Sequence, residues 1–201
     1  MLDRYAAALI KPVVDALAKP LERTGVTADH LTFAGFLIGL GAAFLIASGA
    51  YLLGAAVIFI SRSCDALDGA VARQRRPTDR GGFLDIALDF LFYASIPLAF
   101  ALADPARNAL AAATLLTAFV GTASSFLAFA VIAAKRGMAS TAYPDKSFYF
   151  LGGLAEATET LAAFAAMCVW PQHFAALAYA FSAACAITIA TRLWWGWQAL
   201  K

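Results

Sequence analysis

Four aspartates interrupt an otherwise apolar part of the chain, spaced as Asp65-x2-Asp68 and then Asp85-x3-Asp89. On a helix, residues three or four positions apart lie on one face, so each pair would present two carboxylates to the same side. A carboxylate at the centre of a membrane-spanning helix costs roughly 3 kcal/mol on insertion scales, so two such pairs need a compensating cation. Carboxylate oxygens are hard ligands that suit Mg²⁺, Mn²⁺ or Ca²⁺. The spacing therefore predicts a divalent-metal site formed by these four aspartates.

The residues between the two acidic pairs suit a ligand that carries phosphate. Gly69 and Gly81 have no side chain and would let a phosphate or a nucleotide approach the backbone, and Arg73 offers a fixed positive charge to phosphate oxygens. Two divalent ions bridged by carboxylates beside an arginine favour phosphoryl or substituted-phosphoryl transfer. Two alternatives stay open. The acids could line the ion pathway of a channel or transporter, or they could only stabilise packing by pairing with Arg62, Arg73, Arg75 and Arg76.

The composition is typical of a membrane protein. Of 201 residues, 62% are hydrophobic and only 14% are charged, which is too apolar for an ordinary soluble domain. Several apolar runs approach or exceed the roughly 20 residues that span a bilayer. The segments expected to span lie at about residues 30–50, 52–75, 82–103, 107–134, 147–169 and 174–197.

An amphipathic helix is expected ahead of these spans, in residues 1–26. Tyr5, Leu9, Val13 and Leu17 recur at helical spacing, with charged residues elsewhere on the helix, as in a helix that lies on a membrane surface. The predicted fold is thus an all-α integral membrane protein. Its N-terminal interfacial helix (1–26) precedes a catalytic domain of six transmembrane helices (27–201).

Six spans place both termini on one side of the membrane. All Lys and Arg residues except Arg107 fall on that side when Arg62 is counted with them. The positive-inside rule then predicts cytoplasmic termini and cytoplasmic loops at 73–80 and 135–146. Asp65 lies about 12 Å along a helix axis from Arg73, so the acidic site is expected to open to the cytoplasm. A bacterial inner membrane is the expected location, and no nucleic-acid partner is expected.

The complete pattern resembles the signature of the CDP-alcohol phosphotransferases. All its fixed positions are present, in the order Asp65-x2-Asp68-Gly69-x2-Ala72-Arg73-x7-Gly81-x3-Asp85-x3-Asp89. The spacer before Gly81 is one residue shorter than in the family pattern, at a loop where length varies most easily. The resemblance implies an enzyme that moves a phosphatidyl or other substituted phosphate group from a CDP-activated lipid, such as CDP-diacylglycerol, to an alcohol and releases CMP.

The resemblance also implies roles for individual residues. Two Mg²⁺ or Mn²⁺ ions would be held by Asp65, Asp68, Asp85 and Asp89. Asp89 would also act as the general base that accepts the proton of the acceptor hydroxyl. The CDP moiety would be surrounded by Asp68, Gly69, Ala72, Arg73 and Gly81.

The segment entering the first span often has the sequence P-N-x-L-T in this family and lies near the cytidine. Here it is Ala28-Asp29-His30-Leu31-Thr32. Asp29 and Thr32 are therefore candidates for contact with the CDP group, although a simple helix cap is an equal alternative. A homodimer is expected, as in the family.

The sequence leaves the acceptor alcohol open. Lys135 and Arg136 could bind a phosphate on glycerol 3-phosphate or inositol phosphate, or only anchor the cytoplasmic end of a span. Glu156 and Glu159 share one face of the expected fifth helix, at a depth similar to that of Asp65. They could bind a polyol or the cation of an amino alcohol, or pair with Arg62 and support packing.

The predicted function is therefore phospholipid synthesis, with a polyol, a polyol phosphate or an amino alcohol as acceptor. Two other classes compete with it. One is a cation- or proton-coupled transporter that uses the intramembrane carboxylates, and the other is a non-catalytic membrane scaffold that keeps a nucleotide site.

Overall fold

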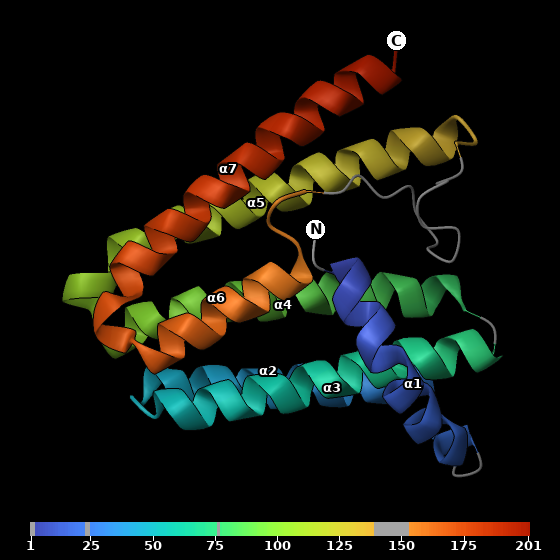
Figure 1. Ribbon diagram of the computed structural model, residues 1–201, viewed down its shortest axis with the longest axis horizontal. Helices are drawn as coiled ribbons and strands as arrows, with labels where there is room; N and C mark the ends of the chain where they lie inside the picture. Colours follow the sequence, from blue (N-terminus) through green and yellow to red (C-terminus); the bar gives the residue numbers. More distant parts are fainter. Residues whose placement is uncertain (1–2, 23–24, 76, 139–152) are drawn as a thin grey trace.

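The structure is a computed structural model that describes the whole chain except residues 1–2, 23–24, 76 and 139–152 (Figure 1). Within the described ranges every regular element is a helix. In chain order they are α1 (Asp3–Glu22), α2 (Ala28–Ala47), α3 (Tyr51–Arg75), α4 (Asp79–Ala103), α5 (Pro105–Lys135), α6 (Ala157–Val169), the short 3-10 helix η1 (Pro171–His173) and α7 (Phe174–Ala199).

Polar side chains define where α2 and α4 begin. At α2 the Thr27 hydroxyl accepts a hydrogen bond from the backbone N–H of His30, and His30 Nδ1 accepts one from the N–H of Thr27, both at 3.3 Å. At α4 the Thr78 hydroxyl accepts from the N–H of Gly81 at 3.1 Å. These contacts satisfy N–H groups that a helix start leaves unpaired. Thr27, rather than Asp29, is therefore the cap of α2.

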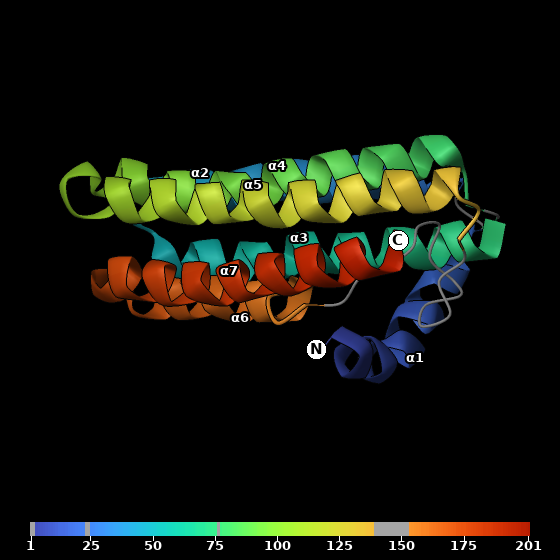
Figure 2. The same ribbon diagram turned by 90° about the horizontal axis from the view of Figure 1, so that it is seen from above.

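The helices pack in two layers. Seen from above, α2, α4 and α5 form one layer and α3, α6 and α7 the other (Figure 2). α2 packs against both α3 and α4, and α5 packs against both α4 and α7. α1 lies across α3 at one end of the bundle instead of running parallel to it (Figure 1). The two helices that carry the aspartates thus come from opposite layers and share α2 as a neighbour.

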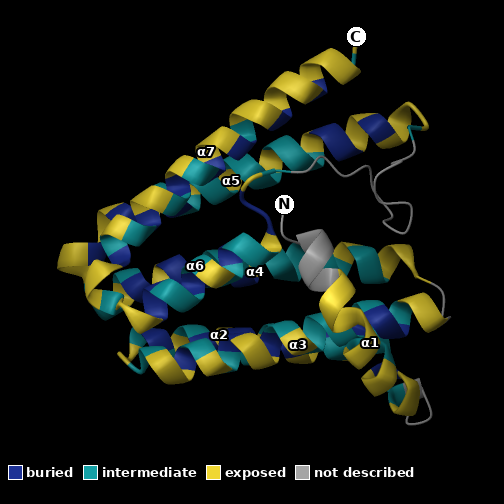
Figure 3. Cartoon of the chain, in the orientation of Figure 1, coloured by how far each residue is buried: buried dark blue, intermediate teal, exposed yellow. Residues whose placement is uncertain are grey.

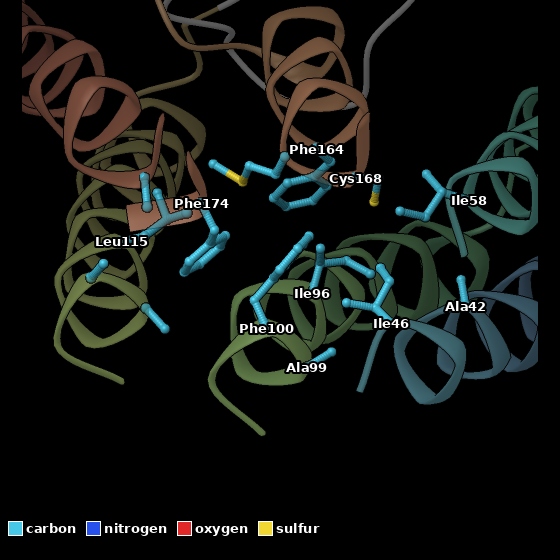
Figure 4. Packing of buried hydrophobic residues seen from close by; sticks show 14 of the residues in the cluster. Ala42, Ile46, Ile58, Ile96, Ala99, Phe100, Leu115, Phe164, Cys168 and Phe174 are labelled. Carbon is cyan, nitrogen blue, oxygen red and sulfur yellow. The ribbon is translucent and has the colours of Figure 1, made fainter. Parts of the chain in front are cut away.

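The main hydrophobic core brings together buried apolar side chains of α2, α3, α4, α5, α6 and α7 (Figure 4). The ring of Phe100 stacks on that of Phe174, with centroids 4.4 Å apart, and on that of Tyr51 at 5.6 Å. Such aromatic pairs add to the free energy gained from burying their surface. Exposed residues, by contrast, occur along the helices (Figure 3), and many of them are large apolar residues, which include Leu37, Phe44, Leu52, Leu110 and Val131. An apolar outer surface is what a helical bundle in lipid requires.

Four helical segments of the described chain are long and apolar enough to cross a membrane: α2, α4, α5 and Pro171–Ala199, which contains α7. α3 is long enough but carries the charged motif. α6 has 13 residues, which corresponds to roughly 20 Å, whereas the hydrocarbon core is about 30 Å thick. The all-helical membrane class is confirmed, while the count of six spans, the interfacial role of residues 1–26 and the division into two domains stay predictions.

The start expected for the fifth helix, at residue 147, is not where α6 begins. α6 starts at Ala157, residues 147–152 lie outside the described part of the chain, and residues 153–156 are not helical. Glu156 is the N-cap of α6 in an extended conformation, so it stands outside the helix. The expectation that Glu156 and Glu159 share a helix face is therefore wrong.

Gly39 allows α2 and α4 to approach each other closely. A Cβ added at Gly39 would lie 2.5 Å from Cδ2 of the buried Phe92. We predict that Gly39→Ala lowers the free energy of unfolding by about 1–3 kcal/mol, because an overpacked contact forces neighbouring side chains to shift. Thermal unfolding of the purified protein in detergent would measure the change.

Gly41→Ala is the matched control on the same helix, because a Cβ there meets nothing within 4 Å. Alanine is the better helix former by about 1 kcal/mol, so this variant should be neutral or slightly more stable. Equal destabilisation by both substitutions would contradict the importance of the close approach at Gly39.

Candidate active site

α3 and α4 bring three aspartates into one group. The ligand oxygens of Asp65, Asp68 and Asp85 all lie within 4.8 Å of one another, and Asp68 is only 5% exposed. Among the residues that the structure describes, this is the group of carboxylates close enough to share a metal ion. Hard oxygen donors at such separations fit Mg²⁺ or Mn²⁺. The chemistry of the donor set thus agrees with the predicted metal site.

Asp89 lies beside this group and pairs with an arginine. Its Oδ1 is 2.5 Å from Nη1 of Arg62, and the same Nη1 is 3.4 Å from Oδ1 of Asp65. The Arg62 side chain is 9% exposed, and its guanidinium lies 4.0 Å from the ring centroid of Phe92. The structure therefore brings three of the predicted ligands together and holds the fourth next to them through Arg62.

The segment that leads into α2 touches both halves of the motif. The Thr32 hydroxyl donates a hydrogen bond of 2.6 Å to Oδ2 of Asp68, and both residues are buried. Asp29 accepts a hydrogen bond of 2.5 Å from Arg80, and a Cβ added at Gly81 would lie 3.4 Å from Oδ1 of Asp29. Asp29 and Thr32 are thus adjacent to the motif, as expected of residues near a bound nucleotide.

The other residues predicted to contact the CDP moiety follow Asp68 on α3. Ala72 is half-buried and Arg73 is exposed. A Cβ added at Gly69 would lie 3.3 Å from Nη1 of Arg73, so the arginine folds back over the glycine. The guanidinium of Arg73 thus lies next to the backbone of Gly69, which has no side chain of its own. The contact of these residues with CDP stays a prediction.

A cavity of about 230 Å³ opens beside Asp89, between α4, α5, α7 and the start of α6. Its lining consists of Asp89, Phe90, Tyr93, Phe119, Thr122, Phe126, Ala155, Glu156, Ala157, Thr160, Cys185 and Arg192. Aromatic rings thus make up much of its wall, and a few polar groups converge on it. Such a combination is typical of a small-molecule site.

Arg192 is the principal cation of this cavity. It is 8% exposed, its Nη1 donates to the backbone oxygen of Thr122 at 3.1 Å, and its guanidinium lies 5.7 Å from the ring of Phe126. Its Nε is buried and has no hydrogen-bond partner in the described structure. A buried N–H without an acceptor is costly, and guanidinium groups bind phosphate and carboxylate strongly, so the geometry indicates an anionic ligand.

Sequence reasoning missed Arg192. The positive-inside pattern counts it with the basic residues of the cytoplasmic side, and Arg62 is the arginine that the sequence offers as an alternative partner of the two glutamates. That alternative is wrong, because Arg62 pairs with Asp65 and Asp89, whereas Arg192 is the arginine that interacts with Glu156. One signal was available: an ionisable residue inside a membrane helix is by default a candidate for function.

The two glutamates differ in their surroundings. Glu156 is 8% exposed and lines the cavity, and its Oε1 accepts a hydrogen bond of 2.9 Å from the N–H of Gly153. Oε2 of Glu159 accepts from the N–H of Glu156 at 3.3 Å, which caps α6. The cavity lining in the described structure includes Glu156 and not Glu159. Glu156 is therefore the better candidate for contact with an acceptor.

Thr188 fixes the backbone that precedes Glu156. Its hydroxyl accepts hydrogen bonds from the N–H groups of Leu154 and Ala155, at 3.0 and 2.9 Å, and donates to the backbone oxygen of Ala184 at 3.0 Å. Thr188 and Arg192 are four residues apart on α7 and so lie on one face of that helix. The same face of α7 therefore supplies the arginine and positions the glutamate.

Lys135 and Arg136 lie exposed at the end of α5 and are not part of the described cavity lining. A second hollow, of about 450 Å³, shares Arg192 with the first and extends between α5 and α7 to Ile132 and Lys201. Lys201 thus lines the same hollow as Arg192. An acceptor role for Lys135 and Arg136 stays a prediction.

The model of the CDP-alcohol phosphatidyltransferase family matches residues 25–194, and the chain therefore belongs to this family of phospholipid-synthesising membrane enzymes. This confirms the resemblance inferred from the motif. Inner membrane protein YnjF of Escherichia coli (strain K12) is 51% identical over 201 residues, covering 100% of this chain and 98% of that protein. Archaetidylinositol phosphate synthase of Methanothermobacter thermautotrophicus is 46% identical over 83 residues, which are 40% of this chain and 43% of that protein.

The fold is also similar to that of a solved protein. The crystal structure of Mycobacterium tuberculosis phosphatidylinositol phosphate synthase with CDP-DAG bound has a TM-score of 0.74 at 23% identity, covering 92% of this chain and 94% of that chain. The same protein in complex with manganese and citrate has a TM-score of 0.71 at 23% identity, covering 92% of this chain and 88% of that chain. At this identity the likeness establishes the helical fold.

Thr32 provides a test of the metal site. We predict that Thr32→Val weakens Mn²⁺ binding by roughly tenfold to a hundredfold, because hydrogen bonds that orient ligating carboxylates typically contribute this much. The change keeps the shape of the side chain but removes the donor to Asp68. Isothermal titration of the purified protein with Mn²⁺ would measure it.

Thr117→Val is the control, because the Thr117 hydroxyl is exposed and donates only to the backbone of its own helix, at Ala113. It should leave Mn²⁺ affinity unchanged. If Thr32→Val also bound Mn²⁺ normally, Asp68 would not depend on Thr32 for its orientation as a ligand.

Proposed function

We propose that this protein transfers a phosphatidyl group from CDP-diacylglycerol to a hydroxyl of a polyol phosphate and releases CMP, with inositol phosphate as the first candidate acceptor. The observation that carries the proposal is the position of Asp89. It lies beside the three-aspartate group and also lines the cavity that contains the buried Arg192. The carboxylate of Asp89 can therefore contact both the CDP-linked donor at the metal site and the acceptor alcohol in the cavity.

Family membership and named relatives support this choice. The family consists of CDP-alcohol phosphatidyltransferases, and relatives named archaetidylinositol phosphate synthase and phosphatidylinositol phosphate synthase match 40% and 44% of the chain. A transporter or a non-catalytic scaffold would not require the glycines and the Ala-Arg pair of the motif. These two alternatives are accordingly disfavoured.

The donor end of the site is formed by α2, α3 and α4. Asp65, Asp68 and Asp85 would hold the divalent ions, with Asp89 completing the set. When bound, these ions neutralise the negative charge of the pyrophosphate and of the departing CMP. Thr32 orients the carboxylate of Asp68, while Arg73 and the bare backbone at Gly69 receive the phosphates.

The acceptor end requires a base and a means of orientation. Asp89 takes the proton of the acceptor hydroxyl, since an alcohol is a weak nucleophile until a carboxylate accepts that proton. The hydroxyl oxygen then forms a bond to the lipid-linked phosphorus, and the bond from this phosphorus to the CMP oxygen breaks. Arg192 binds the phosphate of the acceptor, and Glu156 accepts hydrogen bonds from its other hydroxyls.

We place the protein in a bacterial inner membrane, in accordance with the name of its Escherichia coli relative. α3 and α6 complete six spans, and in α3 the charged residues Arg62 and Asp65 pair with each other and with Asp89 of α4. Residues 1–26 lie along the cytoplasmic surface before the catalytic domain of residues 27–201. Both termini and the active site face the cytoplasm, and two copies form a homodimer.

The direct test uses purified protein in nanodiscs that contain CDP-diacylglycerol, with Mg²⁺ or Mn²⁺. Inositol phosphate, inositol, glycerol 3-phosphate, serine and choline are supplied separately. We expect CMP release and a new lipid, detected by mass spectrometry, with inositol phosphate and only in the presence of a divalent ion. If CDP-diacylglycerol were not consumed with any acceptor, the proposed activity would be wrong.

Asp89 should be needed for turnover more than for donor binding. We predict that Asp89→Asn lowers kcat by about 10²–10⁴-fold, the usual contribution of a general base. Binding of CDP-diacylglycerol should change only a few-fold. Asp79→Asn, at an exposed position in the first turn of the same helix, is the control and should keep wild-type turnover. Near-normal CMP release by Asp89→Asn would exclude the assignment of Asp89 as base.

Arg192 and Glu156 should govern the acceptor alone. We predict that Arg192→Gln raises the acceptor KM by about ten- to hundredfold and that Glu156→Gln raises it less, both with little change in the donor KM, because lost ground-state binding raises KM. Glu159→Ala should leave the acceptor KM unchanged and lower only thermal stability, because it removes the oxygen that caps α6. Equal effects of Arg192→Gln on donor and acceptor would assign the arginine a structural role.

A further inference from the structure

Arg62 lies outside the family signature but inside the acidic site. It precedes Asp65 by one helical turn on α3. Its Nη1 lies 2.5 Å from Oδ1 of Asp89 and 3.4 Å from Oδ1 of Asp65. A single guanidinium nitrogen thus contacts one carboxylate from each of the two helices that form the metal site.

Further contacts, with Phe92 and Ser61, fix the position of the Arg62 side chain. Its guanidinium lies 4.0 Å from the ring centroid of Phe92, and its Nη2 donates to the Ser61 hydroxyl at 3.1 Å. Ser61 in turn donates to the backbone oxygen of Gly35 on α2 at 2.7 Å. With a side chain only 9% exposed, Arg62 is a fixed buried cation rather than a mobile surface charge.

A fixed cation at this place neutralises part of the carboxylate charge, as a metal ion would. It offsets the repulsion between Asp65 and Asp89, whose side chains are 32% and 30% exposed and are therefore only partly screened by water. It also occupies Oδ1 of Asp89, whereas the oxygens of Asp65, Asp68 and Asp85 already lie within 4.8 Å of one another. A divalent ion that binds Oδ1 of Asp89 must therefore compete with Arg62. An ion at the other three aspartates competes with it less, because Oδ1 of Asp65 lies farther from the same nitrogen, at 3.4 Å.

We propose that Arg62 is a built-in counter-ion that stabilises the metal-free site and sets the order of metal loading. The first ion binds at Asp65, Asp68 and Asp85. The second binds only when Asp89 exchanges Arg62 for the metal. Arg62 is therefore a positioning residue that controls when Asp89 joins the metal site. The proposal rests on the proposed role of the four aspartates as metal ligands.

The test combines two measurements on the full-length protein in detergent: titration calorimetry with Mn²⁺, and thermal unfolding with and without Mn²⁺. In Arg62→Gln the competing charge is gone, so the weaker of the two Mn²⁺ affinities should rise by about tenfold or more. The metal-free protein should melt at a lower temperature, and the rise in Tm on adding Mn²⁺ should be larger than in the wild type.

Two further variants make the result specific. Arg62→Lys keeps the positive charge and should retain the weak second affinity. Arg107→Gln removes an exposed arginine that pairs with Asp104 at 3.6 Å, outside the acidic motif, and should change neither measurement. If Arg62→Gln fails to fold, Arg62→Gln combined with Asp89→Asn should restore folding, because both members of the buried pair are then neutral. Failure of the double variant to fold would overturn the proposal.

Three other outcomes would overturn it. An unchanged Mn²⁺ affinity with lower stability in Arg62→Gln would make Arg62 a packing residue only. A reduced Mn²⁺ affinity in this variant would mean that Arg62 supports the metal ligands instead of competing for them. If the wild-type protein bound no Mn²⁺ at all, the metal site of the proposed function would fail first, and this inference with it. Wild-type binding of Mn²⁺ together with either of the first two outcomes would refute only the role of Arg62.

Discussion

The repulsion between carboxylates gathered inside an apolar bundle, one of them buried and the others partly exposed, is the constraint on which the rest of this structure depends. Asp65, Asp68 and Asp85 lie within 4.8 Å of one another, where negative charges repel strongly unless cations or hydrogen-bond donors compensate them. The structure supplies both kinds of compensation, through Arg62 and the Thr32 hydroxyl. The remaining charge makes the site a strong attractor for divalent metal ions.

The helices around the acidic site are arranged to hold this charge in place. α2 lies beside both α3 and α4, and the absence of a side chain at Gly39 brings it close to Phe92. Phe92 in turn lies under the guanidinium of Arg62. Packing of the apolar part of the bundle and electrostatics of the acidic part are therefore linked through one aromatic ring. A change in the α2–α4 contact would be transmitted to the cation that holds Asp89.

Asp89 lies at the boundary between two environments. On one side is the three-aspartate group, and on the other is a cavity with aromatic walls, Glu156 and Arg192. The opposite charges of Glu156 and Arg192 suit an acceptor that carries both hydroxyl groups and an anion, as a polyol phosphate does. Family membership establishes the class of reaction, while the acceptor proposed above rests on these few side chains.

The sequence by itself determined the membrane class, the approximate positions of the helices and the composition of the acidic motif. These follow from local periodicity and from spacing along one helix, which any single segment reveals. Only the tertiary structure decided that Asp89 pairs with Arg62, that Glu156 stands outside α6, and that Arg192 enters the cavity beside it. Each of these contacts joins segments far apart in the chain, such as α4 with α3, or α7 with the start of α6. Which residues form these contacts depends on how the helices pack around the charged side chains. A pattern within one segment of the sequence does not contain this information.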